Sequence, residues 1–324
     1  MSQNIGTVIQ QLRRRHRVGQ GELAETLGVS VQAVSKWETG KSNPDLHLLP
    51  KLAEYFGVSI DSLFAGVQET QELSKEVSEQ LEVNNYGWTE LTKSDWQGTI
   101  LPDYGPYTPT EEQLHLLGDV RGKAVLEICC GCGESLLWLK EQGAGELWGL
   151  DISAERIDKA EKILSNFDWK GKLFTSPMEI DPGIPHRYFD LVISIYGLGW
   201  STDPDKTIQL IGEYLKPGGR FIFSWDNPLM QCIDAVDGRY VLSRSYVKER
   251  VIDLEKRGSR LCMHNWKLST YLNGLANHGF IIEQVVEESA YDQEEADIFQ
   301  EGKYYSAGLA RLLNNVIMIK ARKR

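Results

Sequence analysis

The sequence predicts a small all-α domain of five helices, followed by an α/β domain with a doubly wound, seven-stranded sheet whose last strand is antiparallel. Three observations support this fold class. Apolar residues recur at helical spacing through residues 1–66. Beyond about residue 85, short apolar runs alternate with amphipathic stretches, the pattern of a largely parallel sheet covered by helices on both faces. The 324 residues and the hydrophobic fraction of 41% suffice for two packed cores.

The first domain, residues 1–66, is expected to contain five short helices. The second of them spans Gln20 to Leu27, where the apolar side chains share one face. Ser30 is placed to cap a third helix, since a serine side chain accepts hydrogen bonds from the free amides at a helix start. Pro44 suits the first turn of a fourth helix, and Ile60–Phe64 forms the fifth.

This segment resembles the helix-turn-helix domains of the phage-repressor and Cro family, the XRE type. The residues that carry the resemblance are Gln20, Leu23-Ala24, Leu27-Gly28-Val29-Ser30, Val34-Ser35-Lys36-Trp37-Glu38, Gly40-Lys41 and Pro44. The resemblance implies that residues 1–66 bind double-stranded DNA, with the third helix in the major groove. It also implies a homodimer, because such domains usually bind palindromes as dimers. A domain that only mediates protein contacts is the alternative.

Two sets of DNA-binding residues follow from this resemblance. Val31, Gln32 and Lys36 would face base edges, where Gln32 suits adenine and Lys36 suits guanine. The second set would contact phosphates, which orient a domain without specifying sequence. Its members are Gln20, Ser30, Thr39 and Lys41.

Residues 67–84 are expected to form an acidic connector, with five glutamates, one lysine and no Gly or Pro. Leu73, Val77 and Leu81 recur every four residues, the spacing of an amphipathic helix. Such a helix would pair two chains or lie on the next domain. A solvated tether is the alternative.

The second domain, residues 85–324, is organised around the stretch from 123 to 151. Ala124–Ile128 is a short apolar run typical of a strand buried on both faces, and Gly131 and Gly133 follow it. Asp151 stands at the end of the next strand. Because ligands of open parallel sheets bind outside the carboxyl ends of the strands, these residues should face one crevice. Asp151 is placed there to accept hydrogen bonds from ribose hydroxyls.

The remaining elements follow the same alternation. After the strand that ends at Asp151, further strands are expected at Lys172–Thr175, Phe189–Ser194, Arg220–Trp225, Phe280–Val286 and Val316–Ala321. Helices are expected at Ser135–Lys140, Ala154–Leu164, Thr207–Leu215 and Leu268–His278. Residues 229–262 interrupt this order and are expected to form an insertion that covers the site.

The glycine-rich stretch resembles motif I of the Rossmann-like (class I) methyltransferases, which usually reads acid-x-Gly-x-Gly-x-Gly. The matching residues are Glu127, Gly131 and Gly133, whereas Cys129 stands in place of the first glycine. A Leu-Lys-Pro-Gly-Gly turn at 215–219, before a strand, is a second hallmark of the family. The resemblance covers about residues 100–324 and implies an S-adenosyl-L-methionine-dependent enzyme that acts on a small-molecule methyl acceptor.

By position, the resemblance assigns a set of residues to this cofactor. An acid at Glu127 favours a sulfonium amino acid over a pyrophosphate, Met178 would pack on the adenine and Glu179 would accept from its amino group. Tyr107 would cover the cofactor as part of a lid. The full set is Tyr107, Glu127, Cys129, Gly131, Gly133, Asp151, Ile152, Met178, Glu179 and Ser194.

Methyl transfer from a sulfonium is an in-line displacement that depends chiefly on positioning the nucleophile. A general base is needed only when the acceptor must lose a proton. His264 is the first candidate, followed by Asp226 and Tyr196. A structural hydrogen-bonding role is the alternative for His264.

Three aromatic residues are expected to contact the acceptor. Tyr104 belongs to a Gly- and Pro-rich loop, Trp200 follows the fourth strand and Tyr246 lies in the insertion. Aromatic packing beneath a loop is the alternative role for Tyr104 and for Tyr107.

Composition and missing motifs exclude other functions. A net charge of −11 argues against a general binder of nucleic acids or anionic membranes. The start lacks a signal-peptide pattern, and no apolar run approaches the ~20 residues of a membrane helix, so a cytoplasmic protein without membrane contact is expected. Cys129-x-x-Cys132 supplies only half of a zinc site, so no metal is expected.

DNA methylation is not expected, because residues 194–197 lack the prolines of the base-gripping motif and no Pro-Cys pair occurs. Two functions remain open. In the first, residues 85–324 methylate a small molecule while the first domain regulates transcription, including that of its own gene. In the second, the protein is a transcriptional regulator whose methyltransferase-like domain senses a ligand without turnover. The intact acid and glycine positions favour the first function, whereas Cys129 favours the second.

Overall fold

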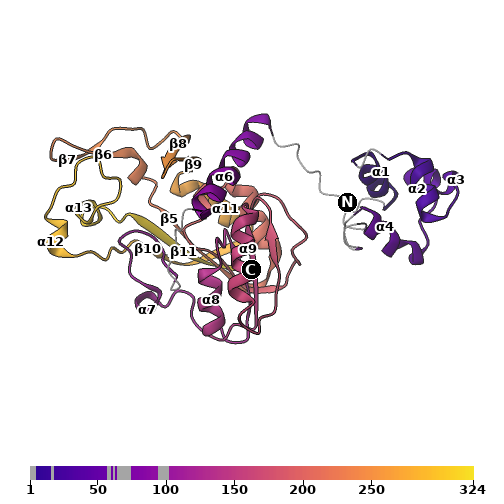
Figure 1. The fold of residues 1–324 in the computed structure, drawn as a ribbon, viewed down its shortest axis with the longest axis horizontal. Coiled ribbons are helices and arrows are strands. Elements are labelled where there is room, and N and C mark those ends of the chain that lie inside the picture. Colours follow the sequence, from indigo (N-terminus) through magenta and orange to yellow (C-terminus); the bar gives the residue numbers. More distant parts are fainter. Residues whose placement is uncertain (1–4, 16–17, 57–59, 61–62, 64–73, 94–101) are drawn as a thin grey trace. The chain divides into compact units, whose positions relative to one another are not determined.

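The computed structural model describes residues 5–15, 18–56, 60, 63, 74–93 and 102–324. They belong to two compact units, Met1–Leu73 and Ser74–Arg324 (Figure 1). Among the described residues, no helix has both the length and the apolar character needed to cross a membrane.

The first unit is helical, as the sequence predicts. Its elements are α1 (Ile5–Arg15), α2 (Gln20–Leu27), α3 (Val31–Glu38), a 3₁₀ turn (Leu46–Leu48) and α4 (Leu49–Phe56). The fourth helix begins later than expected, because the Leu48 amide bonds to the carbonyl of Asp45 in a tighter 3₁₀ turn. The fifth helix, expected over 60–64, falls largely on residues outside the described part.

A tight turn joins α2 to α3. Gly28 ends α2 with φ +70°, a left-handed conformation that costs glycine nothing, and its amide bonds back to carbonyls of the last turn. Ser30 then caps α3, since its side chain accepts from the Ala33 amide at 3.2 Å. This is the helix-turn-helix geometry that the sequence predicts, and α3 occupies the place of the helix expected to read DNA.

A buried ion pair holds the three helices together. Glu38 at the end of α3 is 7% exposed and accepts from Arg13 of α1 at 2.6 and 3.0 Å. The Gln20 amide of α2 donates to the same carboxylate at 2.7 Å. Burial alone would raise the pKa of Glu38, but the hydrogen bonds from Arg13 and Gln20 outweigh it and hold that pKa below its usual range.

The second unit contains the seven-stranded sheet. Its strands are β1 (Ala124–Ile128), β2 (Glu146–Asp151), β3 (Leu173–Thr175), β4 (Phe189–Ser194), β5 (Leu215–Asp226), β10 (Phe280–Val286) and β11 (Val316–Lys323). Their order is β10-β11-β5-β4-β1-β2-β3, and β11 is antiparallel to both neighbours. The predicted order of elements and the antiparallel last strand are confirmed.

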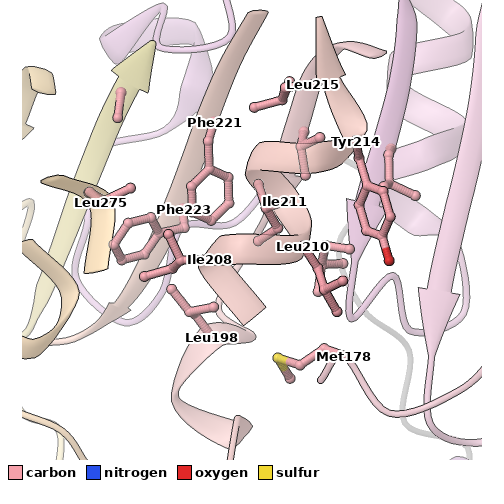
Figure 2. Close-up of a cluster of buried hydrophobic side chains, with 14 of the residues drawn as sticks. Met178, Leu198, Ile208, Leu210, Ile211, Tyr214, Leu215, Phe221, Phe223 and Leu275 are labelled. Atoms are coloured by element: carbon pink, nitrogen blue, oxygen red, sulfur yellow. The ribbon is translucent and has the colours of Figure 1, made fainter. Parts of the chain in front are cut away.

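Helices cover both faces of this sheet. They are α8 (Glu134–Glu141) and α9 (Ala154–Leu164) on one face, and α10 (Pro204–Tyr214) and α11 (Leu268–Asn277) on the other. Alternate residues of each strand point to opposite faces. Figure 2 shows the core on the face covered by α10 and α11, in which Ile208 and Ile211 of α10 pack with Phe221 and Phe223 of β5.

Two hairpins and several short helices form the rest of the second unit. The hairpins are β6 (Ile233–Val236) with β7 (Arg239–Leu242), and β8 (Arg250–Lys256) with β9 (Ser259–Asn265). The short helices are α7 (Glu111–Leu114), α12 (Gln293–Ala296), α13 (Ala307–Ala310) and 3₁₀ turns at Leu198–Trp200 and Met230–Cys232. In Figure 1 the first hairpin lies near α12 and α13, and Tyr240 bonds to Ser306 at 3.1 Å there.

Helix α6 (Lys75–Lys93) crosses residue 84, where the sequence analysis ends the acidic connector. The side chain of Asn84 makes two hydrogen bonds, of 2.8 and 2.7 Å, with the backbone of Cys262 on β9. A Cβ added to Gly87 would lie 2.4 Å from the carbonyl oxygen of Arg260, so the helix lies directly on the strand. The described part of the connector therefore lies on the second unit.

We expect Gly6→Ala to destabilise the first unit by about 1–3 kcal/mol, because overpacking a filled core costs this much. A Cβ on Gly6 in α1 would lie 1.6 Å from the Trp37 carbonyl oxygen in α3, so the two helices would have to separate. The measurement is thermal unfolding of the full chain by calorimetry.

Gly21→Ala is the matched control for this substitution. Gly21 lies in α2 with nothing within 4 Å of an added Cβ, so alanine there should be neutral or stabilising by up to about 1 kcal/mol. Equal unfolding temperatures for the two variants would contradict the close approach of α1 and α3.

Candidate active site

A cavity of about 1040 Å³ lies where β1, β2 and β4 end. Residues at the ends of these strands and in the loops that follow them form one wall, among them Glu127, Gly131, Asp151 and Tyr196. The other wall comes from α6 and β8, through Trp88 and its apolar neighbours. The cavity thus occupies the crevice that the sequence predicts at the carboxyl edge of the sheet.

The glycine loop is held by Asp151. Its carboxylate accepts from the Gly131 amide at 3.0 Å and from the Ser153 amide at 2.9 Å. The backbone is left-handed at Gly131 (φ 57°) and also at Cys129 (φ 62°). The thiol residue therefore occupies a conformation that favours glycine, which explains why glycine is usual at this position of the motif.

Two buried carboxylates in the cavity each keep one oxygen without a protein partner. Glu127 is 2% exposed, and its Oε2 has no hydrogen bond. Glu179 is 6% exposed, and its Oε1 accepts from the Ser201 hydroxyl at 3.0 Å and the Thr202 amide at 2.6 Å, whereas its Oε2 has no partner. A buried unpaired carboxylate oxygen costs free energy, so a donor brought by a ligand would be bound strongly there.

Burial raises the pKa values of the buried carboxyl groups in the cavity. It raises the pKa of Glu127 well above its usual value. It also raises the pKa values of Asp151 and Glu179, although Arg156 opposes the shift at Asp151 and the Thr202 amide opposes it at Glu179. Clustered carboxyls with perturbed pKa values in one cavity are typical of functional sites.

Asp226, at the end of β5, lies behind a ring of three tyrosines. Asp226 is 1% exposed. Its Oδ1 accepts hydrogen bonds from Tyr196 and, at 2.8 Å, from Tyr305, and its Oδ2 accepts one from Tyr304 at 3.0 Å. The Tyr196 and Tyr305 hydroxyls are 2.6 Å apart. All three tyrosines line the cavity. Tyr196 has φ 54°, an uncommon conformation for a bulky residue and one that is concentrated at functional sites.

Sequence reasoning missed Tyr304 and Tyr305. They lie in the loop before α13, some eighty residues after Asp226, and no motif or spacing connects them to it. The pairing of β11 with β5 brings this part of the chain back to the carboxyl end of β5. The pair of adjacent tyrosines after a glycine was the only local signal.

Sequence reasoning also missed the contacts that join α6 to the cofactor side of the cavity. The Arg156 guanidinium of α9 lies 4.3 Å from the ring centroid of Trp88, and its Nε donates to the Thr92 hydroxyl at 3.1 Å. The Thr89 and Ser153 hydroxyls are 2.7 Å apart. Nothing in the helical pattern around Arg156 distinguishes it from a solvated residue, since these partners come from a distant helix.

The ring of His264 on β9 contacts α6. Its Nε2 lies 2.9 Å from the Gln80 side-chain oxygen, and its ring stacks on Trp266 with centroids 4.8 Å apart. Burial lowers the pKa of His264. It is not among the described residues that line the cavity, whereas its neighbour Met263 is. This placement corresponds to the structural alternative rather than to a catalytic base.

Three predicted tyrosines also lie apart from the cavity lining. Tyr104 is fully buried and donates to Glu111 at 2.6 Å, so it packs beneath the loop instead of facing an acceptor. Tyr107 donates to Glu295 at 2.7 Å. The hydroxyl of Tyr246 accepts from the first amide of α11 at 3.3 Å. Each hydroxyl therefore has a protein partner that the sequence did not indicate.

The other predicted residues are brought together. Trp200 lines the cavity between Trp88 and Trp225, with ring centroids 5.0 and 5.6 Å away. Gly133 caps α8, and Ser194 is buried at the end of β4. Of the predicted cofactor set, those that line the cavity are Glu127, Cys129, Gly131, Asp151, Ile152, Met178 and Glu179.

In the first unit, α3 presents the predicted DNA-reading residues to solvent. The exposed members of the two sets are Ser30, Val31, Gln32, Lys36, Thr39 and Lys41. Gln20 differs, because its amide donates to Glu38. Its side chain supports the fold, which the sequence alone did not reveal.

Cys129, Cys130 and Cys132 are clustered in the glycine loop. Within the described part of the chain, no three His, Cys, Asp or Glu side chains are grouped to hold an ion. Burial raises the pKa values of Cys129 and Cys130 well above the usual value, so these side chains remain thiols at neutral pH.

Two family models match the chain. Residues 9–63 match the model described as helix-turn-helix, and residues 107–260 match the model described as methyltransferase domain. The "HTH-type transcriptional activator BcrR" of Enterococcus faecalis is 45% identical over 58 residues, which cover 18% of this chain and 28% of that protein. A protein of Haemophilus influenzae without an assigned function is 27% identical over 195 residues, which cover 56% of this chain and 76% of that protein.

The second unit is similar to solved methyltransferase structures. An S-adenosylmethionine-dependent methyltransferase from Mesorhizobium loti superposes with a TM-score of 0.54 at 22% identity, covering 65% of this chain and 96% of that chain. At this identity the likeness shows the fold.

We expect Glu127→Gln to stabilise the ligand-free protein at neutral pH. Burial raises the pKa of Glu127 in the folded protein above its usual value of 4.5. The stability that the protonated side chain contributes below pH 4.5 is therefore lost as pH rises through the pKa of the folded state. Glutamine carries no charge, so its gain in Tm should be small near pH ~4 and larger near pH ~8. Thermal unfolding across this range measures it.

The exposed Glu141→Gln on α8 is the matched control and should leave the pH dependence of wild type unchanged. A shift for Glu127→Gln that is equal at all pH values would show that Glu127 is not a destabilised buried carboxylate.

Proposed function

Because this chain joins a helix-turn-helix domain to a methyltransferase domain, whose expected cofactor is S-adenosylmethionine, we propose that it methylates a small molecule and regulates transcription. The observation that carries the enzymatic part is the pair of unpaired carboxylate oxygens in one cavity, on Glu127 and Glu179.

The cofactor would lie along the ends of β1, β2 and β3. The amino group of its methionine part would donate to Glu127, its ribose hydroxyls to Asp151 and its adenine amino group to Glu179. Met178 would pack on the adenine ring. Each of these residues lines the cavity, and the two free Oε2 atoms belong to Glu127 in β1 and to Glu179 after β3, with β2 between these strands.

The acceptor would occupy the remaining space near β4 and β5. Pockets for one drug-sized ligand usually measure about 300–1,000 Å³, so the cavity has room for a cofactor and a second small molecule. Trp200 and Trp225 form an apolar wall there, with their rings edge to face at 75°, next to Tyr196. An aromatic or otherwise planar acceptor fits this wall.

The first unit would bind a palindromic operator as a homodimer. Its exposed recognition helix carries Gln32 and Lys36, whose amide and ammonium groups suit base edges in the major groove. Regulation of its own gene would then adjust the amount of enzyme.

Asp151→Ala should weaken binding of S-adenosylmethionine at least tenfold, about 1.4 kcal/mol, because it removes the ribose acceptor and frees the Gly131 loop. Isothermal titration calorimetry of the full chain measures the affinity. Asp158→Ala, an exposed acid on α9, is the matched control and should bind like wild type.

Met178→Ala provides a second variant if Asp151→Ala loses structure, and it should weaken binding through lost adenine packing. Absence of binding to wild type at millimolar ligand would overturn the enzymatic proposal. Binding without transfer to any acceptor would favour the sensor function.

Lys36→Ala should weaken binding to an operator selected from random DNA by about 1–3 kcal/mol and relax the preference at one base pair. Lys51→Ala removes the same charge from an exposed position in α4 and should have a smaller, sequence-independent effect. Gel-shift titrations at several salt concentrations measure both. Equal losses for the two variants, or no selected sequence at all, would contradict the proposed recognition helix.

A further inference from the structure

The cluster at Asp226 has more oxygen–oxygen contacts of hydrogen-bond length than it has hydrogen atoms to donate in them. Asp226 Oδ1, the Tyr196 hydroxyl and the Tyr305 hydroxyl form a triangle in which all three pairs are within hydrogen-bond distance. Two phenols bring two hydrogens, so an ionised carboxylate leaves one of the three contacts without a proton. One additional proton would complete the ring.

Tyr304 offers a way into this cluster. Its hydroxyl donates to Asp226 Oδ2 at 3.0 Å and also bonds with the side chain of Gln231. A phenol that donates one hydrogen bond still has lone pairs that can accept another. Because Tyr304 also lines the cavity, a bound molecule can donate to it directly.

The cluster and the proposed cofactor positions lie on different strands of the same sheet edge. Glu127 lies near the end of β1 and Asp151 ends β2, whereas Asp226 ends β5, which is separated from β1 by β4. Two strand spacings amount to about 10 Å, enough for one aromatic ring between the sulfonium and the cluster. Trp200 and Trp225 line this interval.

We propose, on the basis of the proposed function, that Tyr304 relays a proton to Asp226 from the methyl acceptor, which is a planar molecule with a weakly acidic hydroxyl, a phenol. Tyr305 and Tyr196 position Asp226 through hydrogen bonds to its other oxygen. The relay makes the acceptor oxygen nucleophilic inside an apolar cavity. Amines attack a sulfonium without prior ionisation, so the relay speeds transfer to hydroxyl acceptors and gives amines no comparable gain.

The step balances in atoms and charge. The acceptor oxygen forms its bond to the methyl carbon as the bond from that carbon to sulfur breaks, and the electron pair of this bond remains on sulfur. The acceptor proton moves to Tyr304, and the Tyr304 proton moves to Asp226. The positive sulfonium and the negative carboxylate thus disappear together, so no charge is left in the buried site. Release of the products then lets Asp226 return its proton to water.

The surroundings of Asp226 suit a base. Burial raises its pKa, although the hydrogen bonds from Tyr196 and Tyr305 oppose the shift. The ionisable groups that face it are Tyr196 after β4, Tyr304 and Tyr305 before α13, and Tyr271 of α11, and burial raises the pKa of each phenol. In the described part of the chain, no Lys, Arg or His forms an ion pair with Asp226. The carboxylate therefore lacks a fixed cation that would make it a weaker base.

Tyr304→Phe and Tyr305→Phe test the relay in the full chain. The probes are 2-naphthol, 2-naphthylamine and 4-nitrophenol, a phenol that is largely ionised without help in slightly alkaline buffer. Wild type should transfer tritiated methyl from S-adenosylmethionine to 2-naphthol, and 2-naphthylamine is an acceptor whose rate should not depend on Tyr304. Tyr304→Phe should lower kcat for 2-naphthol by about 10²–10⁴-fold, the usual contribution of a general base, with cofactor affinity unchanged.

The same variant should turn over 4-nitrophenol nearly as fast as wild type, which a merely structural role for Tyr304 would not produce. Tyr291→Phe, at a tyrosine that is 37% exposed, is the control and should behave like wild type with every probe. Equal losses for both phenols, or transfer to the amine alone, would overturn the relay while leaving the proposed function intact. No transfer to any phenol by protein that binds the cofactor would overturn the acceptor class, and no cofactor binding would overturn the proposed function itself.

Discussion

The hydrogen bond from the Gly131 amide to the buried carboxylate of Asp151 is the contact on which the rest of the site depends. It joins the loop after β1 to the end of β2, and the second Asp151 oxygen holds the Ser153 amide at the start of α9. With three chain segments fixed around one carboxylate, the loop can keep a left-handed backbone at Cys129. The side chain of Glu127 is then positioned in the cavity without a donor for its Oε2.

The two ends of the cavity differ in the hydrogen bonds that their carboxylates accept. Glu127 and Glu179 each have an oxygen that accepts no hydrogen bond, which suits a ligand with amino groups. Asp226 accepts from three phenols and is surrounded by hydrogen-bonding oxygens, which suits the receipt of a proton. Binding at one end and proton transfer at the other agree with a methyl donor and an acceptor that share one cavity.

The succession of strands along the chain and the glycine loop could be predicted from the sequence, because apolar periodicity and local motifs determine them. The placement of His264 could not, since its partner Gln80 is 184 residues away and comes from a helix that the sequence predicts only as a connector. Tyr304 and Tyr305 also escaped prediction, because only the return of the chain through β11 brings them to Asp226. Local pattern therefore predicts the cofactor side of the site, and long-range packing decides the acceptor side.

The central claim is that Glu127 and Glu179 mark the two ends of one S-adenosylmethionine site. A crystal structure of the full chain with S-adenosylhomocysteine tests it most directly. The account predicts that the methionine amino nitrogen lies within hydrogen-bond distance of Glu127 Oε2 and the adenine amino nitrogen within that distance of Glu179 Oε2. A bound cofactor that leaves both oxygens without a partner would contradict the account.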